Sequence, residues 1–154
     1  MITTTVIGYG NDLRGDDAIG QRIANTIQSW HLSNVKSYGV HQLTPELAAN
    51  LAQTNIVIFV DAGVNCQTED VQVESLLPAM GKEINGHILN PESLLYLSQY
   101  LYNYCPEAWL ITVPGENFEL CDRISLTAQK GITTALSKIM QILEQNNNSW
   151  MNSE

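Results

Sequence analysis

Two segments of the chain, one β-branched and one almost continuously apolar, have the pattern of strands buried in a sheet. They are residues 3–8 (TTTVIG) and residues 55–61 (NIVIFVD). Residues 35–40, 71–76 and 108–113 are three further strand candidates. The sequence therefore predicts about five strands.

Between these segments, apolar residues recur every three or four positions, which is the period of an amphipathic helix. Such patterns start at Ala18 and, after a polar cap, at Thr44-Pro45, Asn90-Pro91 and Ser125. Because strands alternate with helices, we expect an α/β fold with three layers, α/β/α, around a twisted, mostly parallel sheet. A single domain would span residues 1–145, and residues 146–154 would be a polar C-terminal tail.

The chain is acidic, with a net charge of −9 and a pI near 4.6. Nucleic acid and anionic membranes would repel such a surface, so neither is expected as a partner. Residues 1–5 lack the basic flank of a signal peptide, and no apolar run approaches the ~20 residues that span a bilayer. The three cysteines have no CxxC spacing and indicate a reducing compartment. We expect a cytoplasmic protein.

A glycine-rich turn follows the first strand, in VIGYGNDLRGDDAIG at residues 6–20. The dinucleotide fingerprint needs a third glycine where this chain has Leu13, and no P-loop lysine follows. Two adjacent carboxylates, Asp16 and Asp17, would also compete with phosphate for the positive end of the next helix. Because adjacent helical residues point ~100° apart, we expect Asp16 to be the N-cap and Asp17 to face a ligand.

Two more candidate residues lie on loops expected at the same edge of the sheet, where ligands bind in folds of this class. Asp61 ends the strand at residues 55–61, and His87 lies shortly before the helix that follows Asn90. With Asp17 they would supply two oxygens and one nitrogen, a set suited to nickel, zinc, manganese or iron(II). The alternative is structural: a helix cap, a strand end and a surface histidine.

Together these segments resemble the maturation endopeptidases of [NiFe]-hydrogenases. The shared pattern is a strand, G-x-G-N-x-L-x-x-D-D/E-x-x-G, a strand ending in Asp-Ala, and a histidine before an apolar helix. Here it reads GYGNDLRGDDAIG, VDA and HILNPESLL. Family members cleave a C-terminal extension from the hydrogenase large-subunit precursor after nickel insertion. The resemblance implies a twisted sheet between helices, and Asp17, Asp61 and His87 match the family's metal-contacting positions.

The chain departs from the family pattern at two places. Ala18 stands where many members have glycine after the acidic pair. Gly39-Val40-His41-Gln42 replaces an Asp-Gly-Gly-Thr-like turn that meets the substrate in the family. The segment HQLTPELA resembles the branch serving bidirectional, NAD-linked hydrogenases. By resemblance, we expect substrate contacts at Gly39, His41, Gln42 and Asn11.

The sequence contains neither an HExxH zinc motif nor a GxSxG nucleophile motif, so two mechanisms remain. In the first, Asp17, Asp61 and His87 grip the nickel that the precursor carries, and the metal assists hydrolysis. In the second, Asp17 and Asp61 are an acid–base pair like that of aspartic proteases. No nucleotide cofactor is expected. Two other functions stay open: a Rossmann-like nucleotide-binding module and a non-catalytic nickel-delivery protein.

Overall fold

The computed structural model describes residues 2–80 and 89–152, with side chains described up to residue 146. In chain order the elements are β1 (Thr4–Tyr9), the short 3-10 helix η1 (Gly15–Ala18), α1 (Ile19–Ser29), β2 (Val35–Val40), α2 (Leu47–Leu51), β3 (Ile56–Gly63), β4 (Gln72–Leu76), α3 (Pro91–Tyr102), β5 (Glu107–Pro114) and α4 (Leu126–Asn152). The sheet order is β2-β1-β3-β5-β4, and β4 alone runs antiparallel. The predicted α/β class and mostly parallel five-stranded sheet are confirmed.

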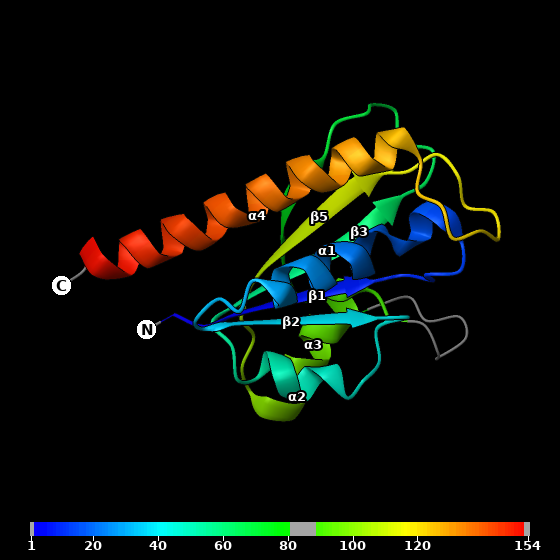
Figure 1. Cartoon of the computed structure of the whole chain (residues 1–154). Coiled ribbons are helices and arrows are strands. Elements are labelled where there is room, and N and C mark those ends of the chain that lie inside the picture. Colours follow the sequence, from blue (N-terminus) through cyan, green and yellow to red (C-terminus); the bar gives the residue numbers. More distant parts are fainter. Residues whose placement is uncertain (1, 81–88, 153–154) are drawn as a thin grey trace.

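Helices cover both faces of this sheet, as Figure 1 shows. Side chains of α1 and α4 share one core, and side chains of α2 and α3 share the other. Strand β3 contributes side chains to both cores, because successive side chains of a strand point to opposite faces of the sheet. Its Ile58 and Val60 belong to the first core, whereas Val57 and Phe59 belong to the second. The three-layer prediction is therefore confirmed.

The helix caps at Asn90 and Ser125 are confirmed. The Asn90 side chain accepts a hydrogen bond from the Ser93 amide at 2.8 Å, and Pro91 follows at the first helical position. The Ser125 hydroxyl accepts one from the Ala128 amide at 3.1 Å. Each cap pairs an amide that would otherwise lack an intrahelical partner.

The predicted cap at Thr44 is wrong. The Leu47 amide bonds to the Thr44 carbonyl, the first bond of a tight turn of i to i−3 bonds, and α2 begins only at Leu47. The Thr44 hydroxyl instead bonds to the Glu46 carboxylate and lowers the pKa of Glu46. The Thr44 side chain thus bonds to the neighbouring Glu46 within the turn and does not cap α2.

One strand and one helix extend further than the sequence predicts. Strand β3 continues to Gly63, so Asp61 lies within the strand and pairs with Thr112 of β5. Helix α4 continues to Asn152, through the segment expected as a tail after residue 145. Among the described residues, no helix has both the length and the apolarity to cross a bilayer.

The strand order reverses at the carboxyl ends of β1 and β3, and we call this edge of the sheet the switch point. The chain passes from β1 to β2 on one side, whereas β3 lies on the other side of β1. Such a reversal is where ligands bind in doubly wound sheets. Helix α1 starts very close to this point, since a Cβ at Gly8 would collide with the carbonyl oxygen of Gly20. Gly8 and Gly20 therefore let α1 pack in direct contact with the sheet beside the switch point.

Candidate functional site

The turn after β1 carries Asp17 at this switch point. Gly10 has a φ of 144°, which favours glycine, and a Cβ there would collide with the Asp17 carbonyl oxygen. The Asn11 amide donates to Asp17 Oδ2 at 2.7 Å, and Asn11 Oδ1 accepts from the Leu13 amide at 2.9 Å. The turn thus fixes one carboxylate oxygen of Asp17. The substrate contact predicted for Asn11 stays a prediction.

Asp16 is fully buried. The prediction that Asp16 is the N-cap of its own helix is wrong, because its side chain does not cap that helix. Its oxygens accept four hydrogen bonds from segments about a hundred residues away: the Glu116 amide at 2.7 Å, the Asn117 amide at 3.0 Å, the Ser125 amide at 2.8 Å and the Ser125 hydroxyl at 2.6 Å. Burial would raise the pKa of Asp16, but these bonds outweigh burial and lower it. Asp16 therefore anchors the turn to the start of α4.

Asp61 lies on the neighbouring strand, half-buried, on the face of β3 that carries Phe59. Burial is the main reason that the pKa of Asp61 rises to about 6, and the charge of Asp17 adds to this effect. Hydrogen bonds from the Tyr9 side chain and from the backbone at Ala62 act in the opposite direction. Asp17 and Asp61, predicted as partners, therefore interact at one edge of the sheet.

Tyr9 and Glu92 also belong to the candidate site, although the sequence did not predict them as site residues. Gly8 pairs with Val60, so the next residues, Tyr9 and Asp61, lie on adjacent strands and the same face. Burial is the main cause that raises the pKa of the Tyr9 hydroxyl, followed by the charge of Asp61; Glu92 in the first turn of α3 adds to it. Tyr9 therefore stays protonated and donates to Asp61. The signal was its place one residue beyond Gly8.

The third predicted ligand, His87, lies outside the described residues. Within residues 2–80 and 89–152, no three His, Cys, Asp or Glu side chains form a group that could hold a metal. The described part of the site thus supplies two carboxylates, Asp17 and Asp61, with Tyr9 and Glu92 beside them. The three-ligand set stays a prediction.

The other residues predicted to contact substrate lie at the end of β2. Gly39 pairs with Gly8, and the carbonyl of Val40 accepts a hydrogen bond from the Gly10 amide at 3.2 Å. His41 and Gln42 follow immediately and are exposed. These residues therefore border the turn that holds Asp17, and their role as substrate contacts stays a prediction.

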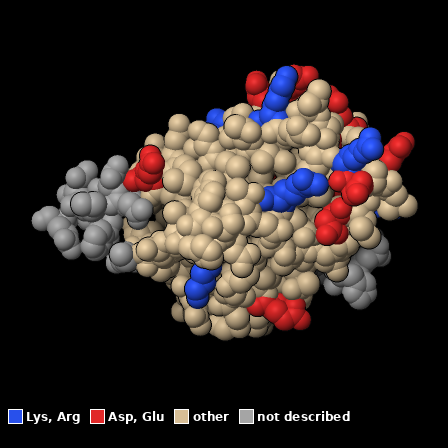
Figure 2. Space-filling model, viewed as in Figure 1, with Lys and Arg blue, Asp and Glu red and all other residues tan. Residues whose placement is uncertain are grey.

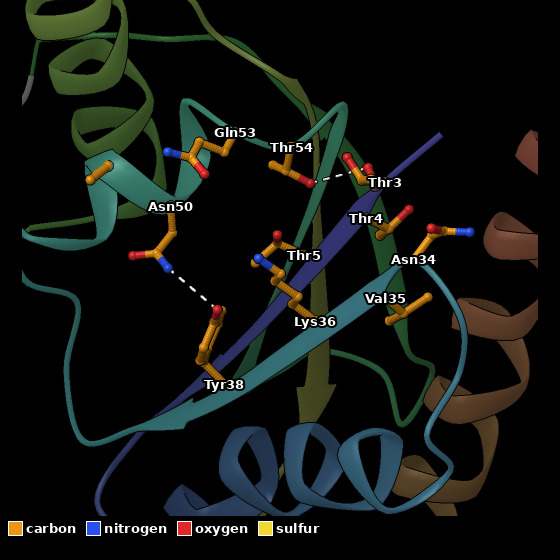
Figure 3. Close-up of a pocket in the computed structure, with 11 residues that line it drawn as sticks. Thr3, Thr4, Thr5, Asn34, Val35, Lys36, Tyr38, Asn50, Gln53 and Thr54 are labelled. Carbon is orange, nitrogen blue, oxygen red and sulfur yellow. Dashed lines mark hydrogen bonds between the residues drawn. The ribbon is translucent and has the colours of Figure 1, made fainter. Parts of the chain in front are cut away.

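A cavity of about 510 Å³ lies at the opposite, amino-terminal edge of β1 and β2 (Figure 3). Polar side chains of Thr5, Lys36 and Gln53 line it, and the Asn50 amide donates to the Tyr38 hydroxyl at 3.4 Å. None of the candidate carboxylates borders this cavity. The candidate chemistry and this cavity therefore belong to different ends of the sheet.

Several solved structures have the same fold. The hydrogenase maturating endopeptidase HybD from E. coli shares 23% identity over 94% of both chains, with a TM-score of 0.78. The [NiFe] hydrogenase maturation protease HycI from Thermococcus kodakarensis shares 20% identity over 92% of both chains, with a TM-score of 0.71. The hydrogenase 2 maturation peptidase from a Thaumarchaeota archaeon shares 21% identity over 92% of this chain and 98% of its own, with a TM-score of 0.69.

Comparison with models of protein families and with curated protein sequences gives no match. The likeness therefore rests on three-dimensional structure, which covers nearly the whole chain. It agrees with the resemblance seen in the segments that contain Gly10, Asp17 and Asp61. The chain has the fold of the hydrogenase maturation endopeptidases.

Proposed function

We propose that this chain is an endopeptidase that removes the C-terminal extension of a [NiFe]-hydrogenase large-subunit precursor after nickel insertion. One observation carries the proposal: Asp17 and Asp61 come from separate segments and interact at the switch point, the edge where sheets of this kind bind ligands. The fold, shared with proteins named as hydrogenase maturation proteases, supports the same function. The precursor would be the protein partner, in the branch of bidirectional, NAD-linked enzymes.

In the preferred mechanism, the precursor's nickel is substrate cargo that Asp17, Asp61 and His87 contact together. A divalent metal polarises a carbonyl or lowers the pKa of a bound water, and either effect assists hydrolysis. The Asn11 amide holds one oxygen of Asp17, and the Tyr9 hydroxyl holds Asp61. Both carboxylates would therefore meet the metal in fixed orientations, which limits the reorganisation required on binding.

A specific observation favours an aspartic mechanism as the second candidate. The pKa of Asp61 is raised to about 6 by burial and by the neighbouring Asp17, so Asp61 keeps its proton to a higher pH than an ordinary aspartate does. Asp61 would then act as the acid and Asp17 as the base that activates water. Nickel would serve only to recognise the mature precursor.

The two remaining functions receive less support. A nucleotide phosphate would need the free amides of the glycine turn, but the Asn11 amide already donates to Asp17. A nickel-delivery protein would need to hold the metal stably, whereas two carboxylates and one histidine would leave coordination positions open. A cytoplasmic location agrees with Cys66, Cys105 and Cys121, which are free thiols.

Precursor in nickel-loaded and nickel-free forms tests this proposal. Intact-mass spectrometry after incubation would show loss of a short C-terminal peptide from the nickel-loaded form. Metal-assisted cleavage predicts a much slower reaction with nickel-free precursor. Equal rates would favour the aspartic mechanism for the chemical step. Retention of nickel by the purified chain, with the precursor left intact, would instead support nickel delivery.

A further inference from the structure

Three leucines beside the candidate site are unusually exposed. Leu13 is 66% exposed, Leu120 is 72% exposed and Leu126 is 73% exposed. A single exposed leucine is ordinary on a protein surface, but several on adjoining segments mark an interaction site more often. We call these three residues the leucine rim.

Backbone hydrogen bonds join the segments that carry the leucine rim. The Cys121 amide donates to the Leu13 carbonyl at 3.0 Å, and the Gly15 amide donates to the Cys121 carbonyl at 2.9 Å. Ser125, next to Leu126, bonds to the buried Asp16. The rim is therefore presented on a fixed frame that also holds Asp17, and the loops lie together at one end of the molecule (Figure 1).

Arginines gather around the rim, and Lys130 lies one turn along α4 from Leu126. The chain has only three arginines, Arg14, Arg22 and Arg123, and all three lie on these segments or on α1 beside them. Arg22 contacts the loop directly, donating to the Asp122 carbonyl at 3.4 Å. Arginine is enriched in protein interfaces, which favours a protein as the partner of this surface. Figure 2 shows basic and acidic side chains interspersed at this end.

We infer that the leucine rim and its arginines are the docking surface for the folded body of the precursor. The matching surface would be an apolar patch bordered by groups of both charges: carboxylates opposite Arg14 and Arg123, and basic groups opposite Asp12 and Glu119. The inference rests on the proposed function and adds a second contact region, apart from the cleaved bond. Docking on this frame sets the C-terminal extension over Asp17 and Asp61.

The test compares the wild type with the triple variant Leu13→Ser, Leu120→Ser and Leu126→Ser. Burial of each leucine against the precursor predicts at least a tenfold rise in KM for nickel-loaded precursor, with kcat within about twofold. Leu101→Ser, at an equally apolar but distant position on α3 that is 55% exposed, is the matched control and leaves KM unchanged. The single variant Leu13→Ser should keep the wild-type melting temperature. It keeps the test valid if the triple variant does not fold.

Charge and binding measurements complete the test. Arg14→Glu combined with Arg123→Glu should raise KM at least threefold, and raised salt should weaken wild-type docking in the same direction. The Kd for the same precursor, measured without turnover in an Asp61→Asn background, separates docking from cleavage. A rim-dependent Kd with no cleavage by the wild type would support docking and contradict the proposed proteolysis. Unchanged KM and Kd in the triple variant would overturn the docking inference.

Discussion

The carboxylate of Asp16 joins the hydroxyl of Ser125 in a hydrogen bond of 2.6 Å, across 109 positions of the sequence. The same carboxylate accepts the Ser125 amide at 2.8 Å, and the Ser125 hydroxyl in turn caps the first turn of α4. A buried acid beside the candidate site therefore performs a structural role, while its neighbour Asp17 interacts with Asp61. Asp16 thus has a structural role, and Asp17 is the candidate for the chemistry of the site.

Replacing Asp16 with Asn should destabilise the protein by about 2–4 kcal/mol, because an amide cannot accept four hydrogen bonds from donors in a buried site. Urea unfolding monitored by circular dichroism measures the effect. The exposed Asp12→Asn is the matched control and should change stability by no more than about 0.5 kcal/mol. Equal stability of the two variants would show that the Asp16 bonds do not hold the turn.

Ionised Asp61 should lower the free energy of unfolding of the metal-free protein at neutral pH. Its folded-state pKa is raised from 3.8 to about 6, so the folded protein binds the proton more tightly than the unfolded chain does. The contribution of Asp61 to stability is then greatest below the unfolded-state pKa and falls as pH rises from about 4 to about 6, by roughly 2–3 kcal/mol. Asp61→Asn should remove this loss, because the amide oxygen can still accept the Tyr9 bond.

The free energy of unfolding, measured from pH 3.5 to pH 8 with a chelator present, checks this prediction. Asp61→Asn should match the wild type at the acidic end and be more stable at the neutral end. A variant that is less stable than the wild type at pH 8 would contradict the raised pKa of Asp61.

Tyr9→Phe should disturb the site while leaving the fold intact. The Tyr9 hydroxyl lowers the pKa of Asp61, so its removal should move that pKa further upward and reduce cleavage by about three- to tenfold near neutral pH. The measurement is the pH profile of kcat/KM for precursor cleavage, whose acidic limb should shift to higher pH. A lower rate with an unshifted profile would mean that Tyr9 acts only through packing.

Much of the fold is predictable because its signals lie within short segments. The apolar run at residues 55–61 identifies the central strand, and Asn90 and Ser125 cap helices as their side-chain chemistry indicates. Thr44 misleads, because its hydroxyl has a competing partner in Glu46. Local signals thus predict the elements, and a competing local hydrogen bond explains the error.

The site is less predictable because its contacts are distant in sequence. Asp17 and Asp61 can be placed at one edge, since carboxyl ends of parallel strands meet there. The partners of Asp16, about a hundred residues away, follow no sequence pattern. Tyr9 reaches Asp61 only in the observed register of β1 and β3. His87 lies outside the described residues, so the three-ligand site stays a prediction.

Cleavage of nickel-loaded precursor by the wild type, Asp17→Asn and Asp61→Asn is the most direct measurement. Intact-mass spectrometry follows the loss of the C-terminal peptide, and the folded state of each variant is verified beforehand by circular dichroism. We predict rapid loss with the wild type and a rate at least about a hundredfold lower with either folded variant, as expected when a group that contacts the reacting atoms is removed. Wild-type rates in both variants would contradict the assignment of these carboxylates to the active site.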